Sequence, residues 1–169
     1  MQLLKKLFPG QEKAGEYPEM KDTDIVAVAS GQVIPADQIE DPVFAQEMMG
    51  QTVAIRPSEG MIVSPANGYL ESVFETGHAF SVRMKDGTGL LVHIGIDTVS
   101  MNGKGFQILE KAGKSVKAGQ PIIKVDLDLV KKAGKPDTVM LIAAEPAHAG
   151  EKIPYAELDR VTRGQKINQ

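Results

Sequence analysis

The chain has 169 residues, of which 42% are hydrophobic and 24% are charged, a balance that suits one soluble globular domain with a sizeable core. Its formal net charge of −3 gives no electrostatic reason to expect nucleic acid as a partner. The absence of cysteine excludes disulfides, thiolate metal sites and cysteine nucleophiles, and it fits a protein of the reducing cytoplasm.

The first 23 residues are predicted to form a flexible N-terminal segment ahead of one domain over residues 24–169. The apolar stretch LLKKLF in this segment ends at Pro9, and it is too short for a signal-peptide core or a bilayer span. We expect at most weak peripheral contact between this stretch and a membrane. A frayed terminus is the simpler alternative.

From Asp24 onward the sequence consists of short apolar runs rich in Val and Ile. Such runs predict strands, and seventeen glycines and ten prolines provide many tight turns between them. Short helices are expected at Pro42–Met49, with Asp41 as N-cap, and at Leu127–Gly134, with glycine at the end. The predicted fold class is therefore all-β, a compact antiparallel sandwich or barrel with one or two short helices.

Two of the three histidines, His78 and His93, flank one predicted hairpin turn in the stretch HAFSVRMKDGTGLLVH. We place Asp86 and Gly87 at the tip of a loop of two or four residues. His93 then lies opposite Phe80, and His78 is its diagonal neighbour on the same face of the sheet. An odd-length loop with a bulge would break this parity.

Paired imidazoles on an apolar, glycine-lined surface can carry a reactive group. With a pKa of about 6.5, one imidazole is a nucleophile at neutral pH, and the other can donate a hydrogen bond to an incoming anion. This suits acceptance and onward transfer of a phosphoryl group, and Thr76 adds a hydroxyl two residues before His78. Two alternatives stay open: ordinary core histidines, or the start of a zinc site that needs further ligands.

Four stretches carry a resemblance to a known family, and they span roughly Ile25 to Val130: SGQVIPADQIEDPVFAQEMMG, SPANGYLESVFETGHAFSV, LLVHIGIDTVSMNGKGF and VKAGQPIIKVDLDLV. The chain resembles the glucose-type enzyme IIA proteins of the bacterial phosphoenolpyruvate-dependent sugar phosphotransferase system. The combination of TGHAFS with VHIGIDTV is the most specific part of the match. The resemblance implies a compact antiparallel β-sandwich with its site in a shallow apolar depression.

The resemblance implies a role for each residue of the site. His93 matches the histidine that carries the phosphoryl group on its far ring nitrogen. His78 matches the one needed to pass the group on, and Thr76 matches a threonine that hydrogen-bonds within the site. The group would come from the phosphohistidine of the carrier protein HPr and go to a cysteine of a sugar-specific IIB domain. No metal, nucleotide or other cofactor is required for this transfer.

The resemblance also implies how partners bind, with rim carboxylates that meet arginine of HPr. The partner-binding positions are Asp41, Phe44, Asp97 and Val99. Regulated transporters or kinases are further partners that the resemblance implies, with a zinc ion shared between His78, His93 and the partner. The expected state is a monomer in the cytoplasm.

The chain departs from the family pattern at several positions. Gly77 stands where many relatives have Asn, and Leu91 and Ile94 stand where they have Phe, so that the apolar patch is expected to be less aromatic. The tail lacks an expected Asn at about Ala144. A non-transport regulatory paralogue, binding partners according to phosphorylation state, is therefore an alternative function. A zinc hydrolase of related fold is a weaker one, because the chain has no His-x-His pair.

Overall fold

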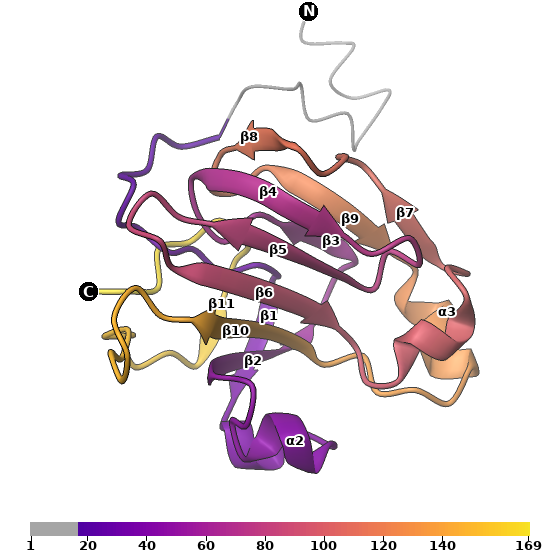
Figure 1. Cartoon of the computed structure of the whole chain (residues 1–169). Coiled ribbons are helices and arrows are strands. Elements are labelled where there is room, and N and C mark those ends of the chain that lie inside the picture. Colours follow the sequence, from indigo (N-terminus) through magenta and orange to yellow (C-terminus); the bar gives the residue numbers. More distant parts are fainter. Residues whose placement is uncertain (1–16) are drawn as a thin grey trace, which may run out of the picture.

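The computed structural model describes residues 17–169, and its strands form two antiparallel sheets (Figure 1). The larger sheet has eight strands in the order β11-β1-β2-β10-β6-β5-β4-β8, and the smaller has three in the order β3-β9-β7. With only two short α-helices among the described residues, this confirms the predicted all-β class. The predicted flexible segment, residues 1–23, lies mostly outside the described residues.

The strands are short, and most of them follow apolar runs of the sequence. The buried apolar run Ile25–Ala29 forms only an isolated bridge at Val26, and β8 and β11 are largely polar. They are β1 Gly31–Ile34, β2 Gln51–Pro57, β3 Met61–Val63, β4 Gly68–Val73, β5 Ala79–Arg83, β6 Gly89–Ile94, β7 Phe106–Ile108, β8 Lys114–Val116, β9 Pro121–Val125, β10 Val139–Glu145 and β11 Arg160–Val161. The helical elements are the 3₁₀ turns η1 Ala36–Gln38 and η2 Thr98–Met101, and the helices α2 Pro42–Ala45 and α3 Leu127–Lys132. None of the helices within residues 17–169 is long and apolar enough to cross a bilayer.

The larger sheet buries one of its faces in the main hydrophobic core. Leu90 and Val92 of β6 are fully buried there. Their partners across the ladder, Val82 and Phe80 of β5, are fully buried as well. Because alternate side chains leave a strand on opposite sides, the odd-numbered residues of β6 project from the other, outer face. His93 is one of these residues.

The outer face carries a second, smaller apolar cluster. Its buried members are Ile34, Ile39, Ala54, Ile96, Met140 and Ile142. Phe44 of α2 and Leu91 of β6 pack against this cluster. The cluster therefore holds α2 on the outer face of the sheet, on the same side as His93.

Helix α2 begins as predicted but is shorter than predicted. The carboxylate of Asp41 accepts a hydrogen bond from the backbone N–H of Val43 at 2.8 Å, which confirms Asp41 as the N-cap. The helix ends at Ala45 rather than at Met49. Glu47 has a φ of +53°, and this left-handed backbone cannot continue a right-handed helix.

The turn between β5 and β6 differs from the predicted one. Its loop has three residues, 85–87, and it is closed by a hydrogen bond from the Met84 N–H to the Thr88 carbonyl at 2.8 Å. Gly87 has a φ of +97°, the left-handed conformation that completes a three-residue turn with a bulge. The predicted loop of two or four residues is therefore wrong.

This odd loop length shifts the register of the hairpin by one residue. His93 pairs with Ala79, and the predicted pairing with Phe80 is wrong. A shift of one residue exchanges the two faces of a strand, so that Phe80 and Val82 face the core instead of sharing a face with His93. By the same parity Ile94, expected in the apolar patch, lies in the core and is 1% exposed.

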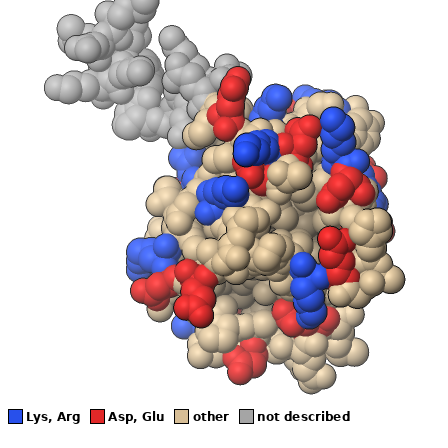
Figure 2. All heavy atoms as spheres, turned by 90° about the vertical axis from the view of Figure 1, so that its left-hand side faces the viewer, with Lys and Arg blue, Asp and Glu red and all other residues tan. Residues whose placement is uncertain are grey.

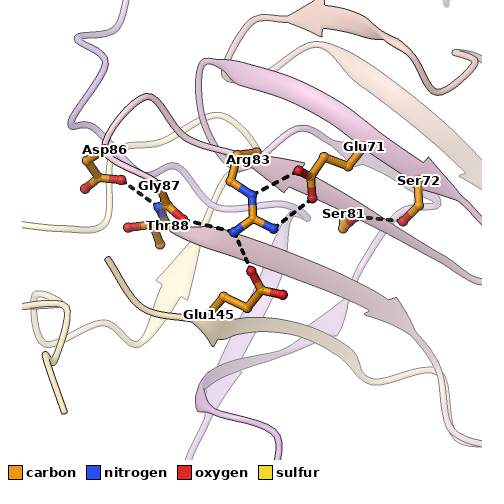
Figure 3. A network of polar contacts seen from close by, with 8 residues as sticks. All are labelled: Glu71, Ser72, Ser81, Arg83, Asp86, Gly87, Thr88 and Glu145. Carbon is orange, nitrogen blue, oxygen red and sulfur yellow. Dashed lines mark hydrogen bonds and ion pairs between the residues drawn. The ribbon is translucent and has the colours of Figure 1, made fainter. Parts of the chain in front are cut away.

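Arg83, the last residue of β5, connects three strands on the outer face (Figure 3). Its guanidinium donates two hydrogen bonds to Glu71 of β4, each 3.0 Å long, and one to Glu145 of β10 at 2.5 Å. It reaches Glu145 across β6 because Gly89 leaves room: a Cβ there would lie 2.9 Å from Arg83 Nη1. The two carboxylates raise the pKa of Arg83, and hydrogen bonding to Arg83 lowers the pKa of Glu71.

We expect Arg83→Met to lower the free energy of unfolding by about 1 kcal/mol, because two strands lose a shared cation whose side chain is 30% exposed. The loss should shrink at high salt, where exposed charges are screened. Lys85→Met is the matched control, since Lys85 is 82% exposed and forms one 3.6 Å ion pair with Asp22. Urea unfolding measures both variants, and equal effects would contradict the role assigned to Arg83.

The end of the molecule on the left of Figure 1 has a surface of mixed charge. Figure 2 shows this face, where lysine and arginine are interspersed with aspartate and glutamate around an uncharged centre. An interspersed pattern offers no continuous basic strip on this face for a phosphate backbone.

Candidate active site

The two predicted histidines lie in contact at one end of the outer face. Their ring centroids are 5.3 Å apart, and the rings meet edge to face at 79°. His93 belongs to β6, whereas His78 lies in the bend just before β5. The prediction that the imidazoles come together is thus correct, although the shifted register would place them on opposite faces of a regular hairpin.

The bend that carries His78 explains how the rings still meet. Gly77 has a φ of +70°, so the chain turns sharply before the strand begins. The His78 carbonyl accepts a hydrogen bond from the Ile94 N–H at 2.8 Å, which fixes the bend to the end of β6. Because His78 lies outside the regular ladder, its side chain does not follow the alternating side-chain directions of β5, and it reaches His93. It is 5% exposed.

His93 is held by its own backbone turn and by an aromatic ring. Its Nδ1 lies 2.8 Å from the carbonyl oxygen of Gly95, a pairing that requires Nδ1 to carry the proton and donate it. The turn is fixed in place because Gly95 N–H donates to the Thr138 carbonyl at 2.8 Å. The ring of Phe44 packs on the imidazole with centroids 5.0 Å apart. In the neutral form, Nε2 therefore keeps its lone pair.

His78 is held by a hydroxyl and by a second aromatic ring. The Oγ1 of Thr76 lies 2.5 Å from Nδ1 of His78. If the hydroxyl donates this hydrogen bond, the neutral ring carries its proton on Nε2 and can donate it to an anion. Phe74 meets His78 edge to face, with centroids 5.2 Å apart.

Both imidazoles favour the neutral form more than a free histidine does. Burial lowers the pKa of His78 below 6.5. Burial also lowers the pKa of His93, more than the hydrogen bond to Gly95 and the nearby charge of Asp41 raise it. The charge of His78 acts in the same direction as burial. At neutral pH both rings are therefore uncharged, the state in which a nitrogen lone pair is available.

We expect the ring signals of His78 and His93 to titrate by NMR with midpoints below 6.5. The free energy of unfolding should fall as the pH drops below about 6.5, since the unfolded chain takes up protons before the folded one does. Midpoints above 6.5 for the paired rings would show that burial does not dominate.

The four predicted rim residues occupy different environments around the pair. Asp41 caps α2, and Phe44 packs on His93. Asp97 has a left-handed backbone with a φ of +57°, and its carboxylate forms a 2.5 Å ion pair with Lys135. Val99 is 51% exposed. The two carboxylates therefore differ, because one caps a helix and the other already has a cation.

Sequence reasoning missed Phe74 as a site residue. It is 48% exposed and contacts His78, so it belongs to the apolar surface around the pair. A signal was present, since Phe74 stands immediately before the turn that leads to Thr76 and His78. Other large apolar side chains are exposed on α2 and in the turn that follows it: Val43, Met48 and Met49.

The pair by itself offers two ligands to a metal. Within residues 17–169, no group of three or more His, Cys, Asp or Glu side chains is placed to hold a metal ion. Any tetrahedral zinc site that used His78 and His93 would thus take its remaining ligands from outside this part of the chain.

Fold and site together define a class: an all-β protein with two contacting, neutral imidazoles among exposed apolar side chains. A sequence profile of the family described as phosphoenolpyruvate-dependent sugar phosphotransferase system, EIIA 1, matches residues 23–149. The PTS system glucose-specific EIIA component of Staphylococcus epidermidis is 44% identical over 126 residues, which are 75% of this chain and 73% of that protein. The Staphylococcus aureus protein of the same description is 42% identical over 126 residues, again 75% of this chain and 73% of that protein.

A solved structure agrees with these relatives. The glucose permease IIA from Mycoplasma capricolum superposes with a TM-score of 0.78 at 32% identity, covering 86% of this chain and 93% of that chain. The chain belongs to the EIIA family. It is a phosphotransferase component that carries a phosphoryl group as phosphohistidine during sugar uptake, and family membership implies interaction with HPr and a IIB domain. These findings give no support to the regulatory or zinc-hydrolase alternatives.

Proposed function

We propose that His93 is the residue that becomes phosphorylated, at Nε2. The observation that carries this proposal is the hydrogen bond from Nδ1 to the Gly95 carbonyl, which leaves the lone pair on Nε2. This lone pair forms a new P–N bond while the P–N bond in the phosphohistidine of HPr breaks. In the second step the P–N bond on His93 breaks as a cysteine sulfur of the IIB domain forms a P–S bond.

His78 is the proposed support for the phosphoryl group and for its onward transfer. With Thr76 donating to Nδ1, the Nε2–H of His78 points its proton toward an anion on the neighbouring ring. The 5.3 Å separation of the rings places this donor within reach of a group on His93. A donor fixed before the reaction stabilises charge without reorganising, which favours transfer in both directions.

The partner contacts are proposed to surround this pair, at Asp41, Phe44, Asp97 and Val99. The exposed apolar side chains beside the pair support docking of a protein rather than of a small ligand. We infer that the phosphocarrier domain spans residues 24–169 and works as a monomer in the cytoplasm. The relatives named glucose-specific support glucose as the sugar.

Phosphoryl transfer between histidines requires no metal, because the donor P–N bond already supplies the driving energy. The site fits zinc only in part, since His78 and His93 offer two nitrogen ligands. A zinc ion shared with a regulated transporter or kinase would use the same nitrogens as the phosphoryl group. Such a complex would therefore form only with the unphosphorylated protein.

The test is intact mass after incubation with phosphoenolpyruvate, enzyme I and HPr. The wild-type protein and His78→Ala should each gain one acid-labile phosphate, whereas His93→Ala should gain none. Phosphate on His93→Ala would show that another residue is the carrier. The absence of any gain on the wild-type protein would contradict the proposed function with this donor.

A further inference from the structure

A shallow groove of about 480 Å³ lies between η2 and α3, beside the histidine pair but not part of it. Its walls are formed by Ser100, Met101, Asn102 and Lys104 on one side and by Leu129, Lys132, Ala133 and Lys135 on the other. In Figure 1, α3 lies on the right of the molecule, beyond the end of β6, which carries His93. The proposed phosphoryl transfer makes no use of this groove.

The charges lining the groove are all positive. Lys104 and Lys132 are exposed, and neither forms an ion pair within residues 17–169. Lys135 is the third cation, and its ammonium group is bound to the Asp97 carboxylate at the edge of the site. The acidic residues of the α3 region, Asp126 and Asp128, are not among the residues that line the groove.

The near wall of the groove adjoins the site. Element η2 follows Asp97 directly, and Thr98 fixes it to β6 by donating a hydrogen bond to the Ile94 carbonyl at 2.5 Å. The loop after η2 packs against the turn of the site, because a Cβ at Gly103 would lie 3.7 Å from the Cα of Thr76. A protein that covers the histidines and Val99 therefore also reaches the near wall of the groove.

We propose that this groove docks an acidic segment of the protein partner that covers the histidine pair. The inference rests on the proposed function, since it needs a partner seated on His93. A small anion fits less well, because the lysines lie on the rim of an open groove and no buried polar side chain points into it. The apolar surface of Leu129, which is 41% exposed, suits the aliphatic part of a bound segment.

The same geometry gives the Asp97–Lys135 ion pair a role in docking. If an arginine of the partner forms an ion pair with the Asp97 carboxylate, it replaces Lys135 there. The Lys135 ammonium group can then turn toward the groove, which Lys135 lines. An acidic side chain of the same partner would then pair with Lys135, and further acidic side chains of its segment with Lys104 and Lys132. The contact exchanges one ion pair for others of matching charge, which chiefly affects association rate and partner choice.

The test compares two double charge reversals that change the net charge equally. Lys104→Glu/Lys132→Glu reverses the charge of two lysines that line the groove. Lys111→Glu/Lys152→Glu reverses the charge of two exposed lysines that do not line it. The association rate with HPr and with a IIB domain is measured for each variant at ionic strengths of about 0.02 and 0.5 M. Intact mass after phosphorylation is recorded in parallel.

For the groove variant we expect association with at least one of the two proteins to slow about tenfold at low salt, and the loss to shrink at high salt. The control variant should stay within about twofold of the wild-type rate. If both variants behave alike with both proteins, the groove docks neither and the inference is overturned. If the wild-type protein gains no phosphate at all, it is the proposed function that fails.

Discussion

Gly95→Ala is expected to lower the free energy of unfolding by about 3 kcal/mol and to slow phosphoryl acceptance by His93. Gly95 has a φ of +74°, which a residue with a Cβ adopts at a cost of about 1–2 kcal/mol. The added Cβ would also lie 2.5 Å from Cγ2 of Thr98 and 2.9 Å from the Pro136 carbonyl. The turn must therefore shift, and with it the carbonyl that accepts the proton of His93 Nδ1.

Gly134→Ala is the matched control for this substitution. Gly134 has a φ of +73°, and a Cβ there would meet nothing within 4 Å. Gly134→Ala should therefore lower the free energy of unfolding only by the cost of the left-handed backbone, about 1 kcal/mol, and leave phosphorylation unchanged. Urea unfolding and the time course of intact mass measure the two effects separately. Equal losses of stability in both variants would mean that the clash at Gly95 is relieved at little cost.

The elements that the sequence predicts well are those fixed by local chemistry. The N-cap Asp41 and the Pro42 that follows it define the start of α2, and the aspartate and glycine around α3 define that helix. Apolar runs likewise predict β1 to β6, β9 and β10, but not the short strands β7, β8 and β11. In each of these cases the determining residues lie within a few positions of one another, so no knowledge of the tertiary fold is needed.

The hairpin shows where local reasoning fails. The residues Asp86-Gly87 fit hairpin loops of two and of three residues. The side chain of Asp86 stabilises the three-residue loop by accepting a hydrogen bond from the Thr88 N–H at 2.8 Å. A difference of one residue then exchanges the two faces of β5 relative to those of β6. The histidines still meet, because Gly77 bends the chain before the ladder begins. The predicted contact between the two imidazoles is thus correct, although the predicted turn and register are not.

Contacts between distant parts of the chain were beyond sequence reasoning altogether. The partners Arg83 and Glu145 are 62 positions apart, and Asp97 and Lys135 are 38 positions apart. Surface ion pairs of this kind leave no periodic pattern, since many lysines and glutamates could form them equally well. The electrostatic character of the rim, and with it the choice of partner, therefore depends on the fold rather than on the motif.

His78→Ala is expected to slow phosphoryl transfer from His93 to a IIB domain by about 100-fold, the loss typical of removing one fixed donor from a charged transition state. The extent of phosphorylation should stay complete, because excess phosphoenolpyruvate drives acceptance to its end point even when the rate is lower. In a quenched-flow experiment the phosphorylated protein is mixed with the IIB domain and the reaction is stopped at set times, which measures the transfer step alone. The folded state is checked by thermal unfolding, since the buried ring leaves a cavity.

Substitutions of Thr76 distinguish the proposed donor role of His78 from a purely structural role of its buried ring. Thr76→Val keeps the shape of the side chain but removes the hydroxyl at His78 Nδ1, so that the proton of the ring is no longer directed to Nε2. We expect transfer to slow about tenfold in this variant, with stability nearly unchanged, and Thr76→Ser to restore most of the rate. Full transfer activity in Thr76→Val would show that His78 acts without a fixed tautomer. The hydroxyl would then serve the fold of the turn rather than the passage of the phosphoryl group.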